Sequence, residues 1–182
     1  MQEEQGISNM RKINKGEIYS FEMKNWNDFF SGKVISVGKY WLSIYDINND
    51  FIIDGVKLIF IPNIKFVFQG KEEIFLTKML EIKAPFYKDY DFPIILNSKI
   101  DVLNMLSKKC RVLFVECENE EIGYLGTILD VSNSDFKLRQ LGRRGKWVEN
   151  KTIQISDVRC ISSDSEYSKS LLLFNQIVWG EK

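Results

Sequence analysis

Short runs that alternate between apolar and polar residues dominate the chain and predict β-strands. The first half carries such runs at 34–37, 42–44 and 59–61, and the second half carries them at 113–117 and 123–131. The runs are rich in β-branched and aromatic side chains and end at Gly, Asn, Asp or Ser, which favour turns. This pattern predicts a mainly β protein built from half-buried strands.

The strand pattern of residues 16–80 recurs at 110–174 without a gap, at a fixed offset of 94 residues. A glycine opens the second strand in both copies, as Gly32 and Gly126, and an Ile-x-Ile motif recurs late in both. Only 8 of the 65 aligned pairs are identical, so the repeat rests on the order of strands and turns rather than on identity. The alternative is one unrepeated β domain whose strands look alike.

Apolar residues at helical spacing predict short helices beside both copies. The predicted helices are 5–14, 72–81, 98–109 and 166–175. Asn97 or Ser98 can cap the helix at 98–109, because a short polar side chain accepts a hydrogen bond from a free backbone N–H of the first turn. The basic pair Lys108 and Lys109 suits the C-terminal end of this helix.

The repeat and the helices divide the chain into three parts. Residues 1–82 are predicted to form a first small β-barrel with flanking helices, and residues 98–182 a helix, a second small β-barrel and a C-terminal helix or tail. Between them, 83–97 is an aromatic connector that contains Pro85 and Pro93. Its aromatic content predicts packing across both barrels, and an exposed aromatic binding strip is the alternative.

The order of predicted elements resembles that of the Sm-like and SH3-like small barrels. The segments that carry the resemblance are Gly32–Val37, Leu42–Ile44 and Leu58–Val67 in the first copy and Gly126–Val131, Phe136–Leu138 and Thr152–Ile161 in the second. The chain also looks like uncharacterised bacterial proteins with the same strand pattern. The resemblance implies a mainly β (α+β) fold of two tandem five-stranded small barrels with short flanking helices.

The positions that bind RNA in Sm proteins are not preserved here. Those proteins usually have an acidic residue six positions after the glycine and an asparagine four positions further on, where this chain has Gly38 and Leu42, or Ser132 and Phe136. The usual Arg-Gly near the fifth strand is also missing from both copies. The resemblance therefore implies the barrel without the RNA pocket, and a fold alone does not assign a function.

The overall charge points to no particular class of partner. Lys plus Arg balance Asp plus Glu at 25 each, so any electrostatic recognition must come from local patches. No apolar run approaches the roughly 20 residues of a membrane span, and residues 1–5 are too polar for a signal peptide. We therefore expect a cytoplasmic protein that does not enter a membrane.

The inventory of reactive side chains argues against an enzyme. Histidine is absent, which excludes Ser-His-Asp and Cys-His catalysis and zinc sites that use histidine. The three cysteines, Cys110, Cys117 and Cys160, are too few for a disulfide framework and are expected to act as small buried hydrophobes. No glycine-rich phosphate loop is present. The sequence thus predicts no catalytic residue, no metal site and no cofactor.

The densest local charge is a basic segment in the second copy. Its members are Lys137, Arg139, Arg143, Arg144, Lys146 and Trp147. Arginine can fork onto phosphate or carboxylate groups, and tryptophan can stack on a base or a guanidinium. The matching positions 48–54 of the first copy are not basic, so the fold does not require this charge. The alternatives are an anion or nucleic-acid site, a contact with an acidic protein surface, and a solvated turn with Trp147 capping the barrel.

An acidic hairpin precedes the basic segment in the same copy. It contains Glu116, Glu118, Glu120 and Glu121. Such a patch can meet a basic partner or keep an exposed turn soluble.

Together these features predict a binding module that is not an enzyme. The first hypothesis is protein–protein binding, as in a bacterial immunity or adaptor protein, because the barrels are duplicated while equivalent loops differ in charge. The second is nucleic-acid binding, RNA above all, through the basic segment. An enzyme that uses carboxylates is a third, and it requires a deep pocket with convergent acids. The sequence leaves the oligomeric state open.

Overall fold

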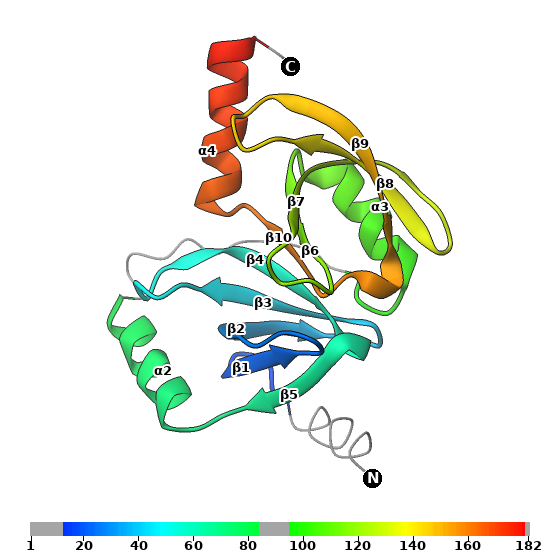
Figure 1. Cartoon of the computed structure of the whole chain (residues 1–182). Helices are drawn as coiled ribbons and strands as arrows, with labels where there is room; N and C mark the ends of the chain where they lie inside the picture. The colour runs from blue at the N-terminus through cyan, green and yellow to red at the C-terminus, as the bar shows by residue number, and fades with distance from the viewer. Residues whose placement is uncertain (1–12, 84–94, 181–182) are drawn as a thin grey trace.

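The computed structural model describes residues 13–83 and 95–180, and its ten strands form one antiparallel sheet (Figure 1). The strands are β1 (Ile18–Met23), β2 (Phe29–Val37), β3 (Trp41–Ile47), β4 (Ile53–Phe60), β5 (Ile64–Phe68), β6 (Leu113–Glu116), β7 (Gly123–Val131), β8 (Asp135–Leu141), β9 (Trp147–Gln154) and β10 (Cys160–Ser163). Their order in the sheet is β5-β1-β2-β3-β4-β10-β6-β7-β8-β9. The mainly β prediction is therefore confirmed.

The offset of 94 residues relates most strands of the two halves. Strands β7, β8 and β9 begin and end 94 residues after β2, β3 and β4. The 3-10 turns η1 (Ile61–Asn63) and η3 (Ile155–Asp157) follow the same rule. The pairing register is also kept, because Gly32 lies opposite Tyr19 and Gly126 lies opposite Leu113. Burial alternates along much of β8, as the alternating sequence predicts, whereas β3 and β4 are mostly buried and β9 is mostly exposed.

The two glycines at this shared register position are required by close strand packing. A Cβ at Gly32 would lie 2.7 Å from the backbone oxygen of Tyr45, and a Cβ at Gly126 would meet the backbone oxygen of Arg139. Both contacts are closer than side chains tolerate. Each glycine therefore lets the third strand of its half approach the second.

The halves join edge to edge into one sheet. Strand β10 pairs with β6 on one side and with β4 on the other, where Ile161 lies opposite Leu58. The hydrophobic cores cross this junction as well: Trp41 and Phe60 pack in the core of the second half, and Cys160 packs in the core of the first. The sheet is open, since β5 and β9 are its two ends and do not pair. Two separate five-stranded barrels and the division at 83–97 stay predictions.

Three of the four predicted helices are confirmed. They are α2 (Lys71–Lys83), α3 (Lys99–Lys109) and α4 (Glu166–Phe174), and α4 continues into the π-helical turn η4 (Asn175–Trp179). Ser98 caps α3 as expected, because its hydroxyl accepts a hydrogen bond from the Asp101 backbone N–H at 3.1 Å. The helix predicted at 5–14 lies almost wholly outside the described residues, as does the aromatic part of the connector.

Each half has a helix packed on equivalent side chains. Leu80 of α2 packs against Ile18 and Ile47. At the positions 94 residues later, Val112 and Leu141 pack with α4. Helix α3 fills the core of the second half instead, with Leu103 and Leu106 fully buried. No helix of the described chain is long and apolar enough to cross a membrane.

Candidate functional site

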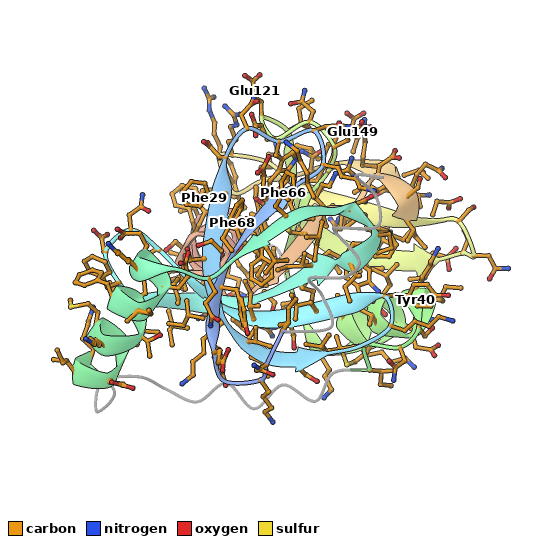
Figure 2. The ribbon with its side chains drawn as sticks, turned by 90° about the horizontal axis from the view of Figure 1, so that it is seen from below. Phe29, Tyr40, Phe66, Phe68, Glu121 and Glu149 are labelled. Atoms are coloured by element: carbon orange, nitrogen blue, oxygen red, sulfur yellow. The ribbon has the colours of Figure 1, made fainter. Side chains whose placement is uncertain are left out.

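Strand β5 ends the sheet, and its outer edge is not paired with any strand among the described residues. Phe66 and Phe68 of this strand are exposed to 45% and 44%, and Phe29 of β2 is exposed to 68%. Figure 2 shows the three rings gathered beside β5. An unpaired strand edge next to exposed aromatic side chains is the kind of surface that binds an extended peptide.

The register explains why these rings lie on one face. Phe29 lies opposite Glu22 on β1, and Glu22 in turn lies opposite Phe66 on β5. Directly opposed side chains on neighbouring strands share a face of the sheet, so Glu22 lies between the two phenylalanines. Lys65, also on β5, forms an ion pair with Glu22 at 2.5 Å. In the next row, Phe68 lies opposite Ser20.

A pocket of ≈ 580 Å³ lies next to these rows, between β5 and the beginning of α2. Its polar side is formed around Glu73, which is 6% exposed. The Glu73 carboxylate accepts hydrogen bonds from the Ser20 hydroxyl and, at 2.6 Å, from the Gly70 backbone N–H. Its hydrogen bonds satisfy this buried acid, so it shapes the pocket and holds α2 against β1. Glu22 and Glu72 line the same pocket.

The strand equivalent to β5 in the second half is β10, and its corresponding edge is covered. Strand β4 lies along it, with Lys57 opposite Ser162, the counterpart of Phe68. The ammonium of Lys57 reaches Glu116, the counterpart of Glu22, at 3.7 Å. The pairing of β4 with β10 therefore shows how the equivalent edge, that of β5, could pair with an added strand.

Lys57 is itself held by two carboxylates. Its ammonium lies 3.0 Å from Asp46 and 3.7 Å from Glu116. Burial favours the neutral amine, but the two carboxylates outweigh it and raise the pKa of Lys57 above its ordinary value. Burial also raises the pKa of Glu116, and the opposing charge of Lys57 limits that rise. A cation is thus the side chain that this position of a covering strand requires.

The acidic hairpin is placed against the first half of the chain. Glu118 accepts a hydrogen bond from Asn25, and Glu120 accepts two from Asn27, at 2.8 Å from its backbone N–H and 3.0 Å from its side chain. Three of the four predicted acidic residues, Glu116 included, therefore have partners within the chain. The exposed Glu121 lines a small pocket of ≈ 200 Å³.

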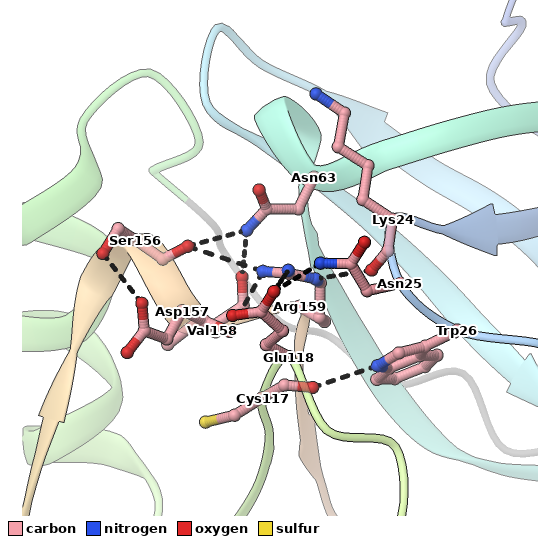
Figure 3. Close-up of polar contacts among 10 residues, drawn as sticks. All are labelled: Lys24, Asn25, Trp26, Asn63, Cys117, Glu118, Ser156, Asp157, Val158 and Arg159. Atoms are coloured by element: carbon pink, nitrogen blue, oxygen red, sulfur yellow. Dashed lines mark hydrogen bonds and ion pairs between the residues drawn. The ribbon is translucent and has the colours of Figure 1, made fainter.

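Figure 3 shows a second set of polar contacts at the same junction, centred on Arg159. This guanidinium is 4% exposed and donates to the backbone oxygens of Lys24 at 3.0 Å and Asp157 at 3.1 Å. Asn63 donates to the backbone oxygen of Val158 at 2.7 Å. The buried polar atoms of both halves satisfy one another here, which fixes the relative position of the halves.

The basic segment is divided between a strand and a turn. Lys137 and Arg139 lie on β8, whereas Arg143, Arg144 and Lys146 lie in the turn between β8 and β9. All five of these cations are exposed.

The turn is held by the C-terminal helical segment. Asn175 donates to the backbone oxygen of Gly145 at 2.7 Å, and the Trp179 indole donates to the backbone oxygen of Arg144 at 3.3 Å. The Lys146 ammonium lies 5.4 Å from the Trp179 ring centre. On the other side, Arg143 lines the same small pocket as Glu121 of the acidic hairpin.

Trp147 is stacked rather than free. The Arg139 guanidinium lies 4.8 Å from the centre of the Trp147 ring. The indole N–H of Trp147 is buried and has no hydrogen-bond acceptor among the described residues. Arg139 is therefore the side chain that stacks on Trp147 within the chain.

The cysteines have the character of buried hydrophobes. Cys160 is fully buried, Cys110 and Cys117 are partly buried, and all three are free. Burial raises the pKa of the Cys110 and Cys117 thiols to about 11, so neither is a thiolate nucleophile at neutral pH. Within 13–83 and 95–180, no group of three or more acids and cysteines has the arrangement of a metal site.

The aromatic edge of β5 was missed by reasoning from sequence. A signal was present in the sequence: the residues 94 positions after Phe66 and Phe68 are the small residues Cys160 and Ser162. Large apolar residues on one copy and small ones on the other indicate different surroundings. Which copy keeps a free edge depends on how the halves join, and the local pattern does not contain that information.

Comparison with known proteins gives no relative to guide the assignment: no family model, no curated protein and no solved structure matches this chain.

Proposed function

We propose that this protein is a protein-binding module, and that the free edge of β5 accepts an extended segment of a protein partner as an additional antiparallel strand. The observation that carries the proposal is the unpaired β5 edge beside the exposed rings of Phe29, Phe66 and Phe68. Backbone hydrogen bonds to the edge supply affinity in such complexes, and pockets for alternate side chains supply specificity.

The junction between the halves supports a particular chemistry for the partner. Where β4 covers β10, the residue opposite Ser162 is Lys57, which reaches Glu116. By the same geometry, a strand on β5 would place the equivalent residue opposite Phe68 and next to Glu22. We therefore expect the partner segment to carry lysine or arginine at this position and apolar residues beside it.

Affinity capture of the full chain from its native host tests this proposal. The bait variants are the wild type, a Phe66→Ser/Phe68→Ser variant and a Val148→Ser control, since Val148 is an exposed apolar residue on β9 at the other end of the sheet. We expect a stoichiometric protein partner that the control retains. The double variant should recover at least about tenfold less of it, as loss of central aromatic contacts does.

A folded-state check accompanies the capture, because the two phenylalanines are half exposed and their replacement should leave the thermal midpoint nearly unchanged. The proposal fails if no stoichiometric protein is recovered, or if the double variant retains it. Recovery of nucleic acid without protein, or of a second copy of the chain alone, also contradicts it. Once a partner is identified, Glu22→Gln should weaken its binding and Val148→Ser should not.

We further propose that each half is a small barrel of the Sm-like or SH3-like type and that the protein acts in the cytoplasm as an immunity-type or adaptor protein. The shared strand order of the halves supports the first statement, and three free cysteines support the second. Nucleic-acid binding through the basic segment is the rival function. It predicts that Arg143→Ala with Arg144→Ala weakens nucleic-acid binding and flattens its salt dependence.

A further inference from the structure

A pocket of ≈ 750 Å³ lies between strands β7, β8 and β9 on one side and the C-terminal helical segment, α4 with η4, on the other. Its polar lining consists of Arg111, Thr127, Arg139, Trp147, Asn175 and Gln176. Leu129 and Leu172 form its apolar lining. This volume is in the range of small-molecule sites, which combine apolar walls with a few polar groups.

Two arginines in this pocket have no acidic partner. Arg139 lies opposite Thr127 in the pairing of β7 and β8, and the Thr127 hydroxyl donates to the backbone oxygen of Arg111. Both arginines line the pocket together with Thr127. In the described part of the chain, neither guanidinium forms an ion pair or a hydrogen bond with another side chain, and no carboxylate lines the pocket. Two uncompensated guanidiniums at one pocket attract an anion.

Trp147 also lines this pocket. Its indole N–H is buried without an acceptor, which is unfavourable unless a ligand or water supplies one. The stacking of Arg139 on the indole ring, at 4.8 Å, orients the guanidinium. Stacking uses the face of the guanidinium and leaves its N–H edge free to donate.

The first half shows that the fold does not impose this arrangement. At the positions 94 residues earlier, Glu17 stands in place of Arg111, Tyr45 in place of Arg139 and Ile53 in place of Trp147. The Glu17 carboxylate accepts a hydrogen bond from the Tyr19 hydroxyl at 2.6 Å. The first half thus has a negative charge with a hydrogen-bond partner at this position. The second half has a positive charge without an acidic partner there.

We infer that this pocket binds the phosphate group of a small phosphate monoester, with Arg111, Arg139 and the Trp147 indole N–H as its donors. A phosphate monoester carries nearly two negative charges at neutral pH, which matches two guanidiniums, and its oxygens are strong acceptors. The organic part of the ligand lies along Leu129 and Leu172. The pocket is at the opposite end of the sheet from β5, so the site is independent of the peptide-binding edge.

The test is a titration of the full-length protein with inorganic phosphate and with adenosine monophosphate, followed by NMR of the tryptophan indole N–H groups. The Trp147 resonance, assigned with Trp147→Phe, should shift on addition of either probe. Calorimetry with adenosine monophosphate should show at least about tenfold weaker binding for Arg111→Gln and for Arg139→Gln. Trp147→Phe should weaken binding by about threefold to tenfold, because it removes one neutral donor.

Arg143→Gln is the matched control, since it removes the same charge from the neighbouring turn and Arg143 does not line this pocket. It should change the affinity by less than about twofold, the effect of a distant and screened charge. Equal weakening by Arg143→Gln and Arg139→Gln would refute the inference, because it would indicate a diffuse basic surface. Absence of any shift of the Trp147 resonance at tens of millimolar phosphate would refute it as well.

Two sources of the phosphate are distinguished with a short oligonucleotide, prepared with and without a 5′-phosphate. Binding of adenosine monophosphate alone supports a free nucleotide or similar metabolite as the ligand. Binding of the oligonucleotide that requires both its 5′-phosphate and Arg139 supports the same site for a nucleic-acid end. Oligonucleotide binding that is independent of the 5′-phosphate and of Arg111 would contradict the pocket.

Discussion

Strands β5 and β10 occupy equivalent places in their halves, yet one is the open end of the sheet and the other lies in its middle. Strand β10 has both edges paired and consists of buried residues. Strand β5 has one edge paired and exposes two phenylalanines. The small residues of β10 fit a strand that is covered on both sides, whereas the large residues of β5 leave apolar surface for a strand that is absent. The same position in a fold thus serves stability in one half and recognition in the other.

The charges of the two halves differ in the same way. Lys57 and Arg159 are buried at the junction, while their counterparts Lys151 and Lys65 are exposed. Glu116 and its counterpart Glu22 are both partly buried, but only Glu116 lies beside a buried lysine. Equivalent or even identical residues therefore have different energetic roles. Matched substitutions at positions 94 residues apart measure that difference directly, and four of them follow in order of expected effect.

The largest single loss of stability is expected in the apolar pair Ile161 and Val67. Ile161 is 1% exposed in the middle of the sheet, and Ile161→Ala should lower the free energy of unfolding by about 3 kcal/mol through lost burial and a cavity. Val67 on β5 is half-buried, and Val67→Ala should cost only about 1 kcal/mol. Chemical denaturation of both variants checks this. Equal losses would mean that β5 is covered in solution.

The next largest loss is expected in the pair Lys57 and Lys151. Lys57→Ala leaves Asp46 and Glu116 without their cation, and breaking a buried pair of this kind costs about 3 kcal/mol or somewhat less here, since both carboxylates keep about a fifth of their surface. Lys151 is exposed on β9, and Lys151→Ala should change stability by less than about 0.5 kcal/mol. A Lys57→Ala variant as stable as the Lys151→Ala variant would contradict the role assigned to the junction.

A smaller difference is expected for Arg159 and Lys65. Arg159→Ala removes the donor of several hydrogen bonds to backbone oxygens at the junction and should cost about 2 kcal/mol. Lys65→Ala breaks only a partly exposed ion pair with Glu22 and should cost less than about 0.5 kcal/mol. Thermal unfolding at fixed pH compares the two. If Arg159→Ala did not change the thermal stability, other contacts would have to couple the halves.

The smallest difference concerns how the free energy of unfolding depends on pH. It is measured with Glu116→Gln, and Glu22→Gln is the matched reference. Because burial raises the pKa of Glu116, the folded state binds its proton more tightly than the unfolded chain does. The wild type should therefore lose stability, relative to Glu116→Gln, as pH rises through and above the ordinary glutamate pKa of roughly 4.3. Denaturation at several pH values tests the sign. A relative gain with rising pH would show that Lys57 outweighs burial.

Much of the local structure follows from the sequence. The alternating pattern predicts the strands, and the helix at 98–109 follows from its spacing and from the Ser98 cap. The charge of the basic segment is plain in the sequence, and its role stays a prediction. Its relation to Arg111 is not predictable from position, because these residues come together only when β7, β8 and the C-terminal helical segment pack side by side.

The partners of the acidic hairpin could not be predicted from the sequence either. Its charges are plain in the sequence, but their partners Asn25 and Asn27 lie 93 residues away and look like ordinary turn residues. The neighbouring sequence does not distinguish a carboxylate that is solvated from one that forms hydrogen bonds with the other half.

The sequence by itself determined the strands, their order within each half and the offset that relates the halves, because period and turn chemistry act over a few residues. Only the tertiary structure decided that β4 covers β10, that β5 remains an edge and that Arg111 joins Arg139 and Trp147 at one pocket. These outcomes depend on which of several similar strand edges pair. That choice is made by contacts between residues far apart in the chain.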